Sequence, residues 1–151
     1  MENEICQLIV IFSPFFVQTT NMKNKFIFCG IIGWCLEIFW TGLHSLQQGK
    51  WNLMGQSSLW MFPIYGCAAI IAPLSKLYHK CNTFIRGVVY MFHIFLGEYL
   101  FGSVLKRFEM CPWDYSASKY HINGLIRLDY APLWFLTGLL YEKLLNSQTK
   151  R

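Results

Sequence analysis

Four long apolar stretches, separated by short polar segments, dominate the chain. They cover residues 26–46, 57–74, 85–105 and 128–145. A helix needs about 20 residues to cross the hydrocarbon core of a bilayer. The first and third stretches reach this length, the second comes close to it, and the fourth reaches it only if its polar ends lie at the headgroups. We therefore expect an all-α fold, an integral membrane bundle of four transmembrane helices, with residues 22–151 forming a single membrane domain.

The first 21 residues differ from the rest of the chain. Their apolar part, residues 5–17, is too short to span a bilayer and is interrupted by Pro14. The chain begins with Met-Glu-Asn-Glu, whereas a cleaved signal peptide has a cationic start. We interpret residues 1–21 as an N-terminal extension that is either interfacial or disordered.

The composition agrees with a membrane protein. Of the 151 residues, 54% are hydrophobic and only 14% are charged, whereas soluble domains carry about 25% charged residues. The net charge of +5 does not indicate a nucleic-acid partner, because the cations lie in short segments between apolar stretches. Eight of the 13 Lys and Arg residues lie in the N-terminal, second connecting and C-terminal segments, and five lie in the other two connecting segments. Cytoplasmic segments carry the excess of Lys and Arg, so both termini of this multi-pass protein are predicted to be cytoplasmic.

The sequence offers little for a metal, a cofactor or nucleotide chemistry. The six cysteines are scattered and form no CxxC pair, so we expect neither a zinc site nor a disulfide framework. The chain also lacks a phosphate-binding glycine-rich loop, a GxSxG motif and an HExxH motif. We therefore expect no metal and no cofactor, and the missing phosphate-binding loop excludes an ABC-type ATPase in this chain.

Glu37 is the first candidate site residue, because it lies near the middle of the first apolar stretch. A charged side chain there costs about 2.5–3.5 kcal/mol on insertion scales. Gly30, Gly33, Thr41 and His44 lie at helical spacing from it, so one face of this helix is small and polar. Small residues let a second helix approach closely, and we expect the carboxylate to lie inside the bundle. It either serves a function or pins the helix packing through a hydrogen bond.

Glu98 repeats this pattern in the third apolar stretch, with Gly102 four residues later. If Glu37 and Glu98 both face inward, they can share a proton, bind a cation or hold a polar headgroup. His93 is the third candidate for this polar site. It lies about 140° around the helix from Glu98, so the two do not share a face, and an interior histidine with a satisfied hydrogen bond is the simpler interpretation.

The segment between the third and fourth stretches, residues 106–127, contains a second group of candidates. It includes CPWDYS at residues 111–116 and the turn dipeptide Asn123-Gly124. We predict that this third loop is an ordered cap over the end of the bundle. The candidate cap residues are Trp113, Asp114, Tyr115, Asn123 and Arg127. The alternative is that the two aromatic side chains only anchor the chain in the headgroup layer.

Asp114 lies between two aromatic residues that the cap would bury. Asp114 can accept local backbone N–H bonds in a turn. If it is drawn inward, its carboxylate needs backbone or cationic partners. Arg127, Arg107 and Lys119 are the candidates in the same segment.

Several blocks of sequence carry a family resemblance. They are GWCLE (33–37), FPIYG (62–66), Glu98-Tyr99 with Gly102, CPWDYS (111–116), and NGLIRLDYA (123–131) with Trp134. Through them, residues 25–145 resemble the eukaryotic transmembrane protein 229 family and its bacterial relatives, described as ABC-transporter permeases of the CmpB type. The resemblance implies a small multi-spanning membrane protein in which Glu37, Glu98 and the Trp113–Tyr115 motif act together.

Three functions fit these observations. The first is a transport component that binds a small polar solute or ion near Glu37 and Glu98, with a homo-oligomer or a partner membrane subunit, because four short helices enclose little space. The second is a membrane scaffold or assembly factor in which the polar residues serve only packing. The third is an intramembrane enzyme acting on a lipid-like substrate, with acid–base residues among Glu37, Glu98, His93 and Asp114. We expect the first function, a transport component. We also expect that the protein is not an enzyme rather than that it is one.

Overall fold

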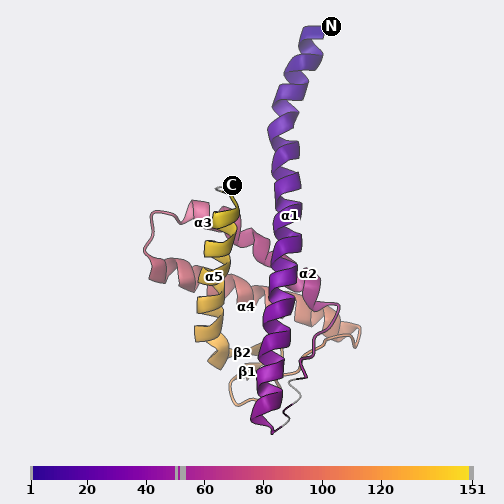
Figure 1. The fold of residues 1–151 in the computed structure, drawn as a ribbon, viewed down its shortest axis with the longest axis vertical. Helices are drawn as coiled ribbons and strands as arrows, with labels where there is room; N and C mark the ends of the chain where they lie inside the picture. The colour runs from indigo at the N-terminus through magenta and orange to yellow at the C-terminus, as the bar shows by residue number, and fades with distance from the viewer. Residues whose placement is uncertain (1, 50, 52–53, 150–151) are drawn as a thin grey trace.

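The protein is mostly helical, with one small β-hairpin (Figure 1). The computed structural model describes the backbone of residues 2–49, 51 and 54–149, and the side chains of those between residues 21 and 147. The elements in order are α1 (Glu2–Gln47), α2 (Met61–Gly66), the 3₁₀ helix η1 (Cys67–Ile70), α3 (Ile71–Leu77), α4 (Thr83–Arg107), β1 (His121–Ile122), β2 (Ile126–Arg127), the 3₁₀ helix η2 (Leu128–Tyr130) and α5 (Ala131–Thr149).

Two helical segments are long and apolar enough to cross a membrane. They are Asn21–Gln47 in α1, with a mean hydropathy of 1.8, and α4, with a mean hydropathy of 1.5. Only 22% of each apolar window is buried within the protein, whereas the core helix of a soluble protein is mostly buried. The exposed apolar side chains need another apolar environment, and lipid supplies it. Both segments match predicted spans, at residues 26–46 and 85–105.

The second predicted span, 57–74, is shorter and less regular than expected. The helix begins at Met61, and the apolar segment Met61–Leu77 is divided into α2, η1 and α3. Pro63 and Pro73 each lack the N–H group that an α-helix interior uses. The helix α5, at the fourth predicted span, begins three residues later than expected, because residues 128–130 form η2 and Pro132 lies in the first turn of α5.

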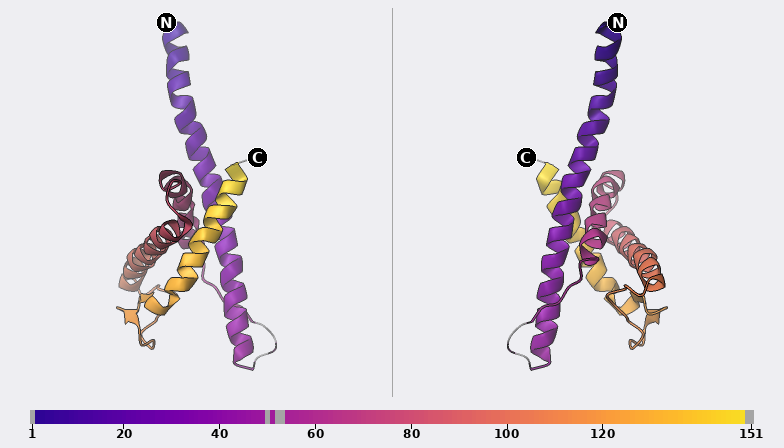
Figure 2. Two further views of the ribbon diagram at one scale, coloured as in Figure 1. Left: turned by 90° about the vertical axis from the view of Figure 1, so that its left-hand side faces the viewer. Right: turned by 90° about the vertical axis from the view of Figure 1, so that its right-hand side faces the viewer.

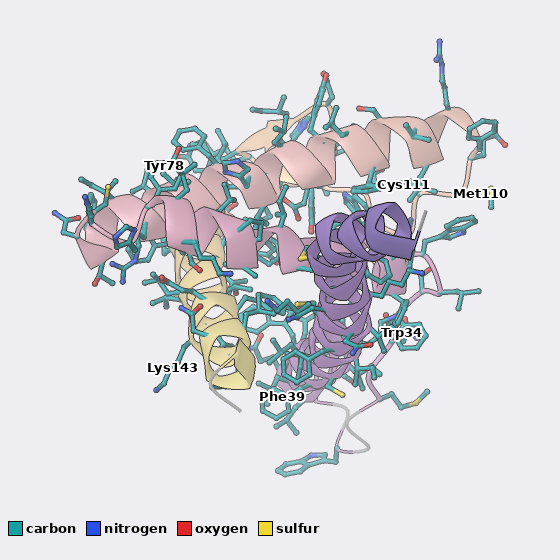
Figure 3. All side chains as sticks on the ribbon, turned by 90° about the horizontal axis from the view of Figure 1, so that it is seen from above. Trp34, Phe39, Tyr78, Met110, Cys111 and Lys143 are labelled. Carbon is teal, nitrogen blue, oxygen red and sulfur yellow. The ribbon has the colours of Figure 1, made fainter. Side chains whose placement is uncertain are left out.

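The helices are not aligned side by side. In Figure 1, α1 and α5 run vertically while α3 and α4 lie across them, and the view along α1 in Figure 3 agrees. Two helical segments within the described residues are long and apolar enough to span a membrane. The bundle of four membrane-spanning helices stays a prediction. The N- and C-termini lie toward one end of the protein, and the α1–α2 connection and the β-hairpin lie toward the other (Figure 1).

The helix α1 continues without a break through residues 2–20 and extends beyond the other elements (Figures 1 and 2). Met1 lies outside the described residues. Whether residues 1–21 act as an interfacial segment stays a prediction.

Close approach of α1 and α2 depends on glycine. A Cβ atom built on Gly33 would lie 2.2 Å from Cγ of Tyr65, and one on Gly30 would lie 2.7 Å from the Phe62 ring. Both distances are far below van der Waals contact, so only glycine fits without moving α2. The small face predicted for the first apolar helix is therefore its packing face.

The core lies where α1, η1, α3, α4 and α5 meet. Its buried residues are Cys29, Ala69, Ile71, Ala72, Tyr90, Tyr141 and Leu145. The Tyr141 hydroxyl donates a hydrogen bond to the Cys29 carbonyl oxygen at 3.1 Å and so ties α5 to α1. An ion pair of 3.0 Å between Arg86 Nε and Glu142 Oε1 joins α4 to α5. The helices are thus held together by both apolar and polar contacts.

Candidate functional site

Glu37 lies on the packing face of α1 and is partly buried. The Ser57 hydroxyl donates a hydrogen bond of 2.5 Å to Oε2 of Glu37, and the Tyr65 side chain of α2 forms a further hydrogen bond with this carboxylate. One turn later, the Thr41 hydroxyl accepts from the Gln56 N–H at 2.8 Å and donates to its carbonyl oxygen at 3.0 Å. The polar face of α1 therefore binds α2 and the segment before it.

Glu98 lies on α4 and is also partly buried. The indole Nε1–H of Trp134 on α5 donates to Oε2 of Glu98 at 3.1 Å. One turn further along α4, Gly102 leaves room for the Trp113 ring, which would lie 3.0 Å from a Cβ atom at that position. The glutamate face of α4 therefore contacts both α5 and the third loop.

Two tyrosines connect these glutamates. Tyr65, beside Glu37, is within electrostatic range of Glu37, Glu98 and Tyr115. Burial raises the pKa of Tyr115, the negative charges of Glu98 and Glu37 act in the same direction together with Tyr130, and Arg127 opposes them. The side-chain contacts place Tyr65 at Glu37. They link Tyr115 to Glu98 through the rings of Tyr130 and Trp134. We call Glu37, Tyr65, Glu98, Tyr115 and Trp134 the acidic–aromatic cluster.

A chain of aromatic rings leads from the third loop to Glu98. The rings of Tyr115 and Tyr130 lie 5.9 Å apart, and those of Tyr130 and Trp134 lie 6.2 Å apart. Both pairs meet edge to face, an arrangement that aromatic quadrupoles favour. The Arg127 guanidinium lies 4.4 Å from the centre of the Tyr130 ring and so supplies a cation at the outer edge of this chain.

The third loop is ordered by a β-hairpin. β1 and β2 pair antiparallel, with His121 opposite Arg127. Asn123 and Gly124 take φ values of +53° and +72° in the turn, a conformation that these two residues tolerate best. The loop packs back on α4, because Leu125 and Ile126 are buried.

Trp113 and Tyr115 hold the loop to this hairpin. The Trp113 indole N–H donates to the Leu125 carbonyl at 3.1 Å, and the Tyr115 backbone N–H donates to the Gly124 carbonyl at 2.8 Å. These bonds order the loop, and the cap over the helix ends stays a prediction.

Asp114 takes the local backbone partner that the turn sequence predicts. Its carboxylate Oδ1 accepts from the Ser116 N–H at 2.9 Å and from the Ser116 hydroxyl at 2.5 Å. The Ser116 hydroxyl and N–H lower the pKa of Asp114, with a further contribution from the charge of Lys106. Asp114 is exposed, and the local turn bonds satisfy it. The cationic alternative is not observed, since no ion pair within the described residues joins Asp114 to Arg107, Lys119 or Arg127.

Arg127 has a different role. Its Nη2 pairs with Asp129 Oδ2 at 2.7 Å, and its Nη1 donates to the Tyr130 hydroxyl at 3.2 Å. It therefore secures the start of α5 to the hairpin. Asn123 is also outside the cluster, with its Nδ2 donating to the Tyr99 hydroxyl at 3.3 Å.

His93 does not join the acidic–aromatic cluster. In the part of the chain that the structure describes, the hydrogen bond of His93 is to the Val89 carbonyl, 2.8 Å from its Nδ1 and one turn earlier on α4. The simpler interpretation, a histidine satisfied within its own helix, describes this geometry. Sequence analysis missed Tyr65 and Trp134 as site residues, although both lie at positions that carry the family resemblance.

The cluster offers carboxylate and aromatic groups, without a set of metal ligands. Over residues 2–49, 51 and 54–149, no group of three or more His, Cys, Asp or Glu side chains could hold a metal ion. Two carboxylates beside phenol and indole groups can bind a proton, a cation or a polar molecule with hydrogen-bond donors.

Comparisons with known proteins support a family assignment. No solved structure matches the chain. A family model with the description "Putative ABC-transporter type IV" matches residues 24–151, which include every member of the acidic–aromatic cluster. Two apolar helices of membrane-spanning length accompany this match. The chain therefore belongs to the family described as "Putative ABC-transporter type IV".

Proposed function

We propose that the chain is a membrane component of a transporter and that it binds a small polar solute or ion between Glu37 and Glu98, beneath the cap. One observation carries this proposal: each of the two described helices of membrane-spanning length holds a partly buried glutamate that is hydrogen-bonded to another segment, Glu37 to Ser57 and Glu98 to Trp134. Ionisable residues within membrane segments are costly and typically mark solute or proton pathways. The family description points to the same class of function.

The transporter needs further subunits. The sequence contains no phosphate-binding loop, so ATP hydrolysis would have to come from a partner protein. A second copy of the chain or another membrane subunit would enlarge the space between the helices. The resemblance to the eukaryotic transmembrane protein 229 family adds the expectation that the same cluster serves related proteins.

A structural role is the second candidate, and one observation favours it. Ser57 already donates to Glu37, and Trp134 already donates to Glu98. Carboxylates that already accept these hydrogen bonds can stabilise the packing of the helices without binding a solute. In that case, replacing either glutamate lowers stability and changes no binding property.

Trp134 makes the proposal testable, because its indole N–H contacts Glu98 directly. We would add Na⁺, K⁺, Mg²⁺, Ca²⁺, ammonium and choline separately to the purified protein in a neutral detergent and record tryptophan fluorescence. We expect at least one of these ions to change the emission with a saturable dependence on concentration. Trp134→Phe should abolish the change, and Glu37→Gln and Glu98→Gln should weaken the binding.

Glu109→Gln is the matched control, because Glu109 is an exposed glutamate just beyond the end of α4. It should bind like the unmodified protein. A panel without a saturable response, or a response that survives both glutamate substitutions, would contradict a cation site at the cluster. A stability loss in Glu37→Gln and Glu98→Gln without a binding change would support the structural role.

A further inference from the structure

A polar groove, whose lining includes no residue of the acidic–aromatic cluster, lies between the start of α4 and the last turns of α5. It has a volume of about 490 Å³, within the range of about 300–1,000 Å³ typical of ligand sites. Its lining residues are Thr83, Arg86, Leu139, Glu142, Lys143, Asn146 and Ser147. All but Leu139 carry a polar or charged group.

The charges in this groove are unevenly paired. Glu142 is neutralised by Arg86, whose Nε lies 3.0 Å from its carboxylate. Lys143 is exposed, and within the described residues no ion pair involves it. It extends outward from α5 (Figure 3). The groove therefore carries a net positive charge.

Arg86 also retains hydrogen-bonding capacity. Its Nη1 donates to the Cys81 carbonyl at 2.8 Å, whereas its Nη2 reaches the Thr83 hydroxyl only at 3.5 Å. The nitrogen Nη2 thus has the least satisfied N–H groups of this guanidinium. The N-terminus of α4, which begins at Thr83, adds the positive end of a helix dipole. These features favour an anionic group with several acceptor oxygens.

An apolar stripe leads from the groove along α5. Leu136 and Leu140 are 63% and 39% exposed, and helical spacing places them on the same face as Lys143 and Ser147. Phe84, beside the groove on α4, is 69% exposed. An acyl chain fits this apolar surface, and a free phosphate ion would leave it uncovered.

We propose that this groove binds the phosphate group of an anionic phospholipid from the surrounding bilayer, with the acyl chains lying along Leu136 and Leu140. Lys143 and Arg86 contact the phosphate, while the Thr83 hydroxyl donates a hydrogen bond to the headgroup. The groove lies at the end of the protein that carries the C-terminus, which the distribution of Lys and Arg predicts to be cytoplasmic. Basic pockets between membrane helices on that side are suited to anionic headgroups.

Native mass spectrometry of the purified full chain tests the proposal. The protein in neutral detergent is mixed with phosphatidylglycerol, with phosphatidylcholine or with soluble glycerol 3-phosphate, and the bound molecules are counted. We expect saturable binding of phosphatidylglycerol and much weaker binding of the other two. Lys143→Gln should weaken phosphatidylglycerol binding by about fivefold, which is the contribution of one cation near a membrane surface. Lys143→Arg should retain it.

Lys119→Gln is the matched control, because Lys119 is an exposed cation in the third loop. The β-hairpin of this loop lies toward the other end of the protein (Figure 1). It should leave phosphatidylglycerol binding unchanged. Equal binding of phosphatidylglycerol and phosphatidylcholine would overturn the proposal, and so would an unchanged affinity in Lys143→Gln. Glycerol 3-phosphate binding as tightly as the lipid would show a site for free phosphate and would also contradict it.

Discussion

Replacing Gly33 with alanine should separate α1 from α2 and disturb the acidic–aromatic cluster. The new methyl group would lie 2.2 Å from Cγ and 2.3 Å from Cβ of Tyr65, more than 1 Å short of ordinary contact. Rotation of the Tyr65 side chain cannot relieve this clash, because Cβ stays in place when the side chain changes rotamer. The helix backbones must therefore move apart.

The expected magnitude follows from two opposing terms. Overpacking costs typically about 1–3 kcal/mol, and a clash with atoms next to the backbone belongs at the upper end. Replacing glycine with alanine in a helix stabilises the helix by about 1 kcal/mol, because alanine has the higher helix propensity. The net loss is about 2 kcal/mol in the free energy of unfolding, which is about thirtyfold in the equilibrium constant.

Gly97→Ala is the matched control, because no atom lies within 4 Å of a Cβ atom built at Gly97 on α4. It should be neutral or slightly stabilising. Reversible unfolding in mixed micelles with increasing dodecyl sulfate, followed by tryptophan fluorescence, gives the free energy of unfolding of both variants. Equal values for Gly33→Ala and Gly97→Ala would refute the close approach of α1 and α2.

Three further predictions concern α5 and the cap. Trp134→Phe removes the hydrogen bond to Glu98 and should lower the free energy of unfolding by about 0.5–1.5 kcal/mol, the range for a typical hydrogen bond, measured in the same micelles. The lowered pKa of Asp114 means that its contribution is present at neutral pH and is lost as the pH falls through the folded-state value. Protease cleavage of the third loop should therefore increase in acid. Asp114→Asn should increase cleavage already at neutral pH and remove this dependence, because Asn accepts the Ser116 bonds more weakly; an unchanged cleavage rate would argue against the cap. With both termini cytoplasmic, a cysteine replacing Ser118 in a background without native cysteines should react with an impermeant maleimide in intact cells, and labelling only after permeabilisation would reverse the topology.

Much of α1 and α4 could be predicted from the sequence because the relevant signals are local. Hydropathy over about 20 residues identified both segments, and the helical spacing of Gly30, Gly33 and Glu37 identified the face that packs against α2. The Asn123-Gly124 turn was also predictable, since few residue pairs tolerate positive φ.

Contacts between distant segments were not predictable in the same way. The bond between Trp134 and Glu98 spans 36 residues and depends on how α5 lies against α4. The bond of Asp114 was predictable because Ser116 is only two residues away. The pairing of Arg127 is equally local, since Asp129 is two residues from it.

We propose that Glu37 and Glu98 bind the same solute. A double-mutant cycle tests this shared binding most directly. The dissociation constant of the tightest-binding cation of the panel would be measured by titration calorimetry for the unmodified protein, Glu37→Gln, Glu98→Gln and the double variant. Two carboxylates that share one cation are coupled, so we predict that the double variant loses clearly less affinity than the two single losses combined. Independent losses that add fully, or single variants that bind as tightly as the unmodified protein, would contradict a shared site.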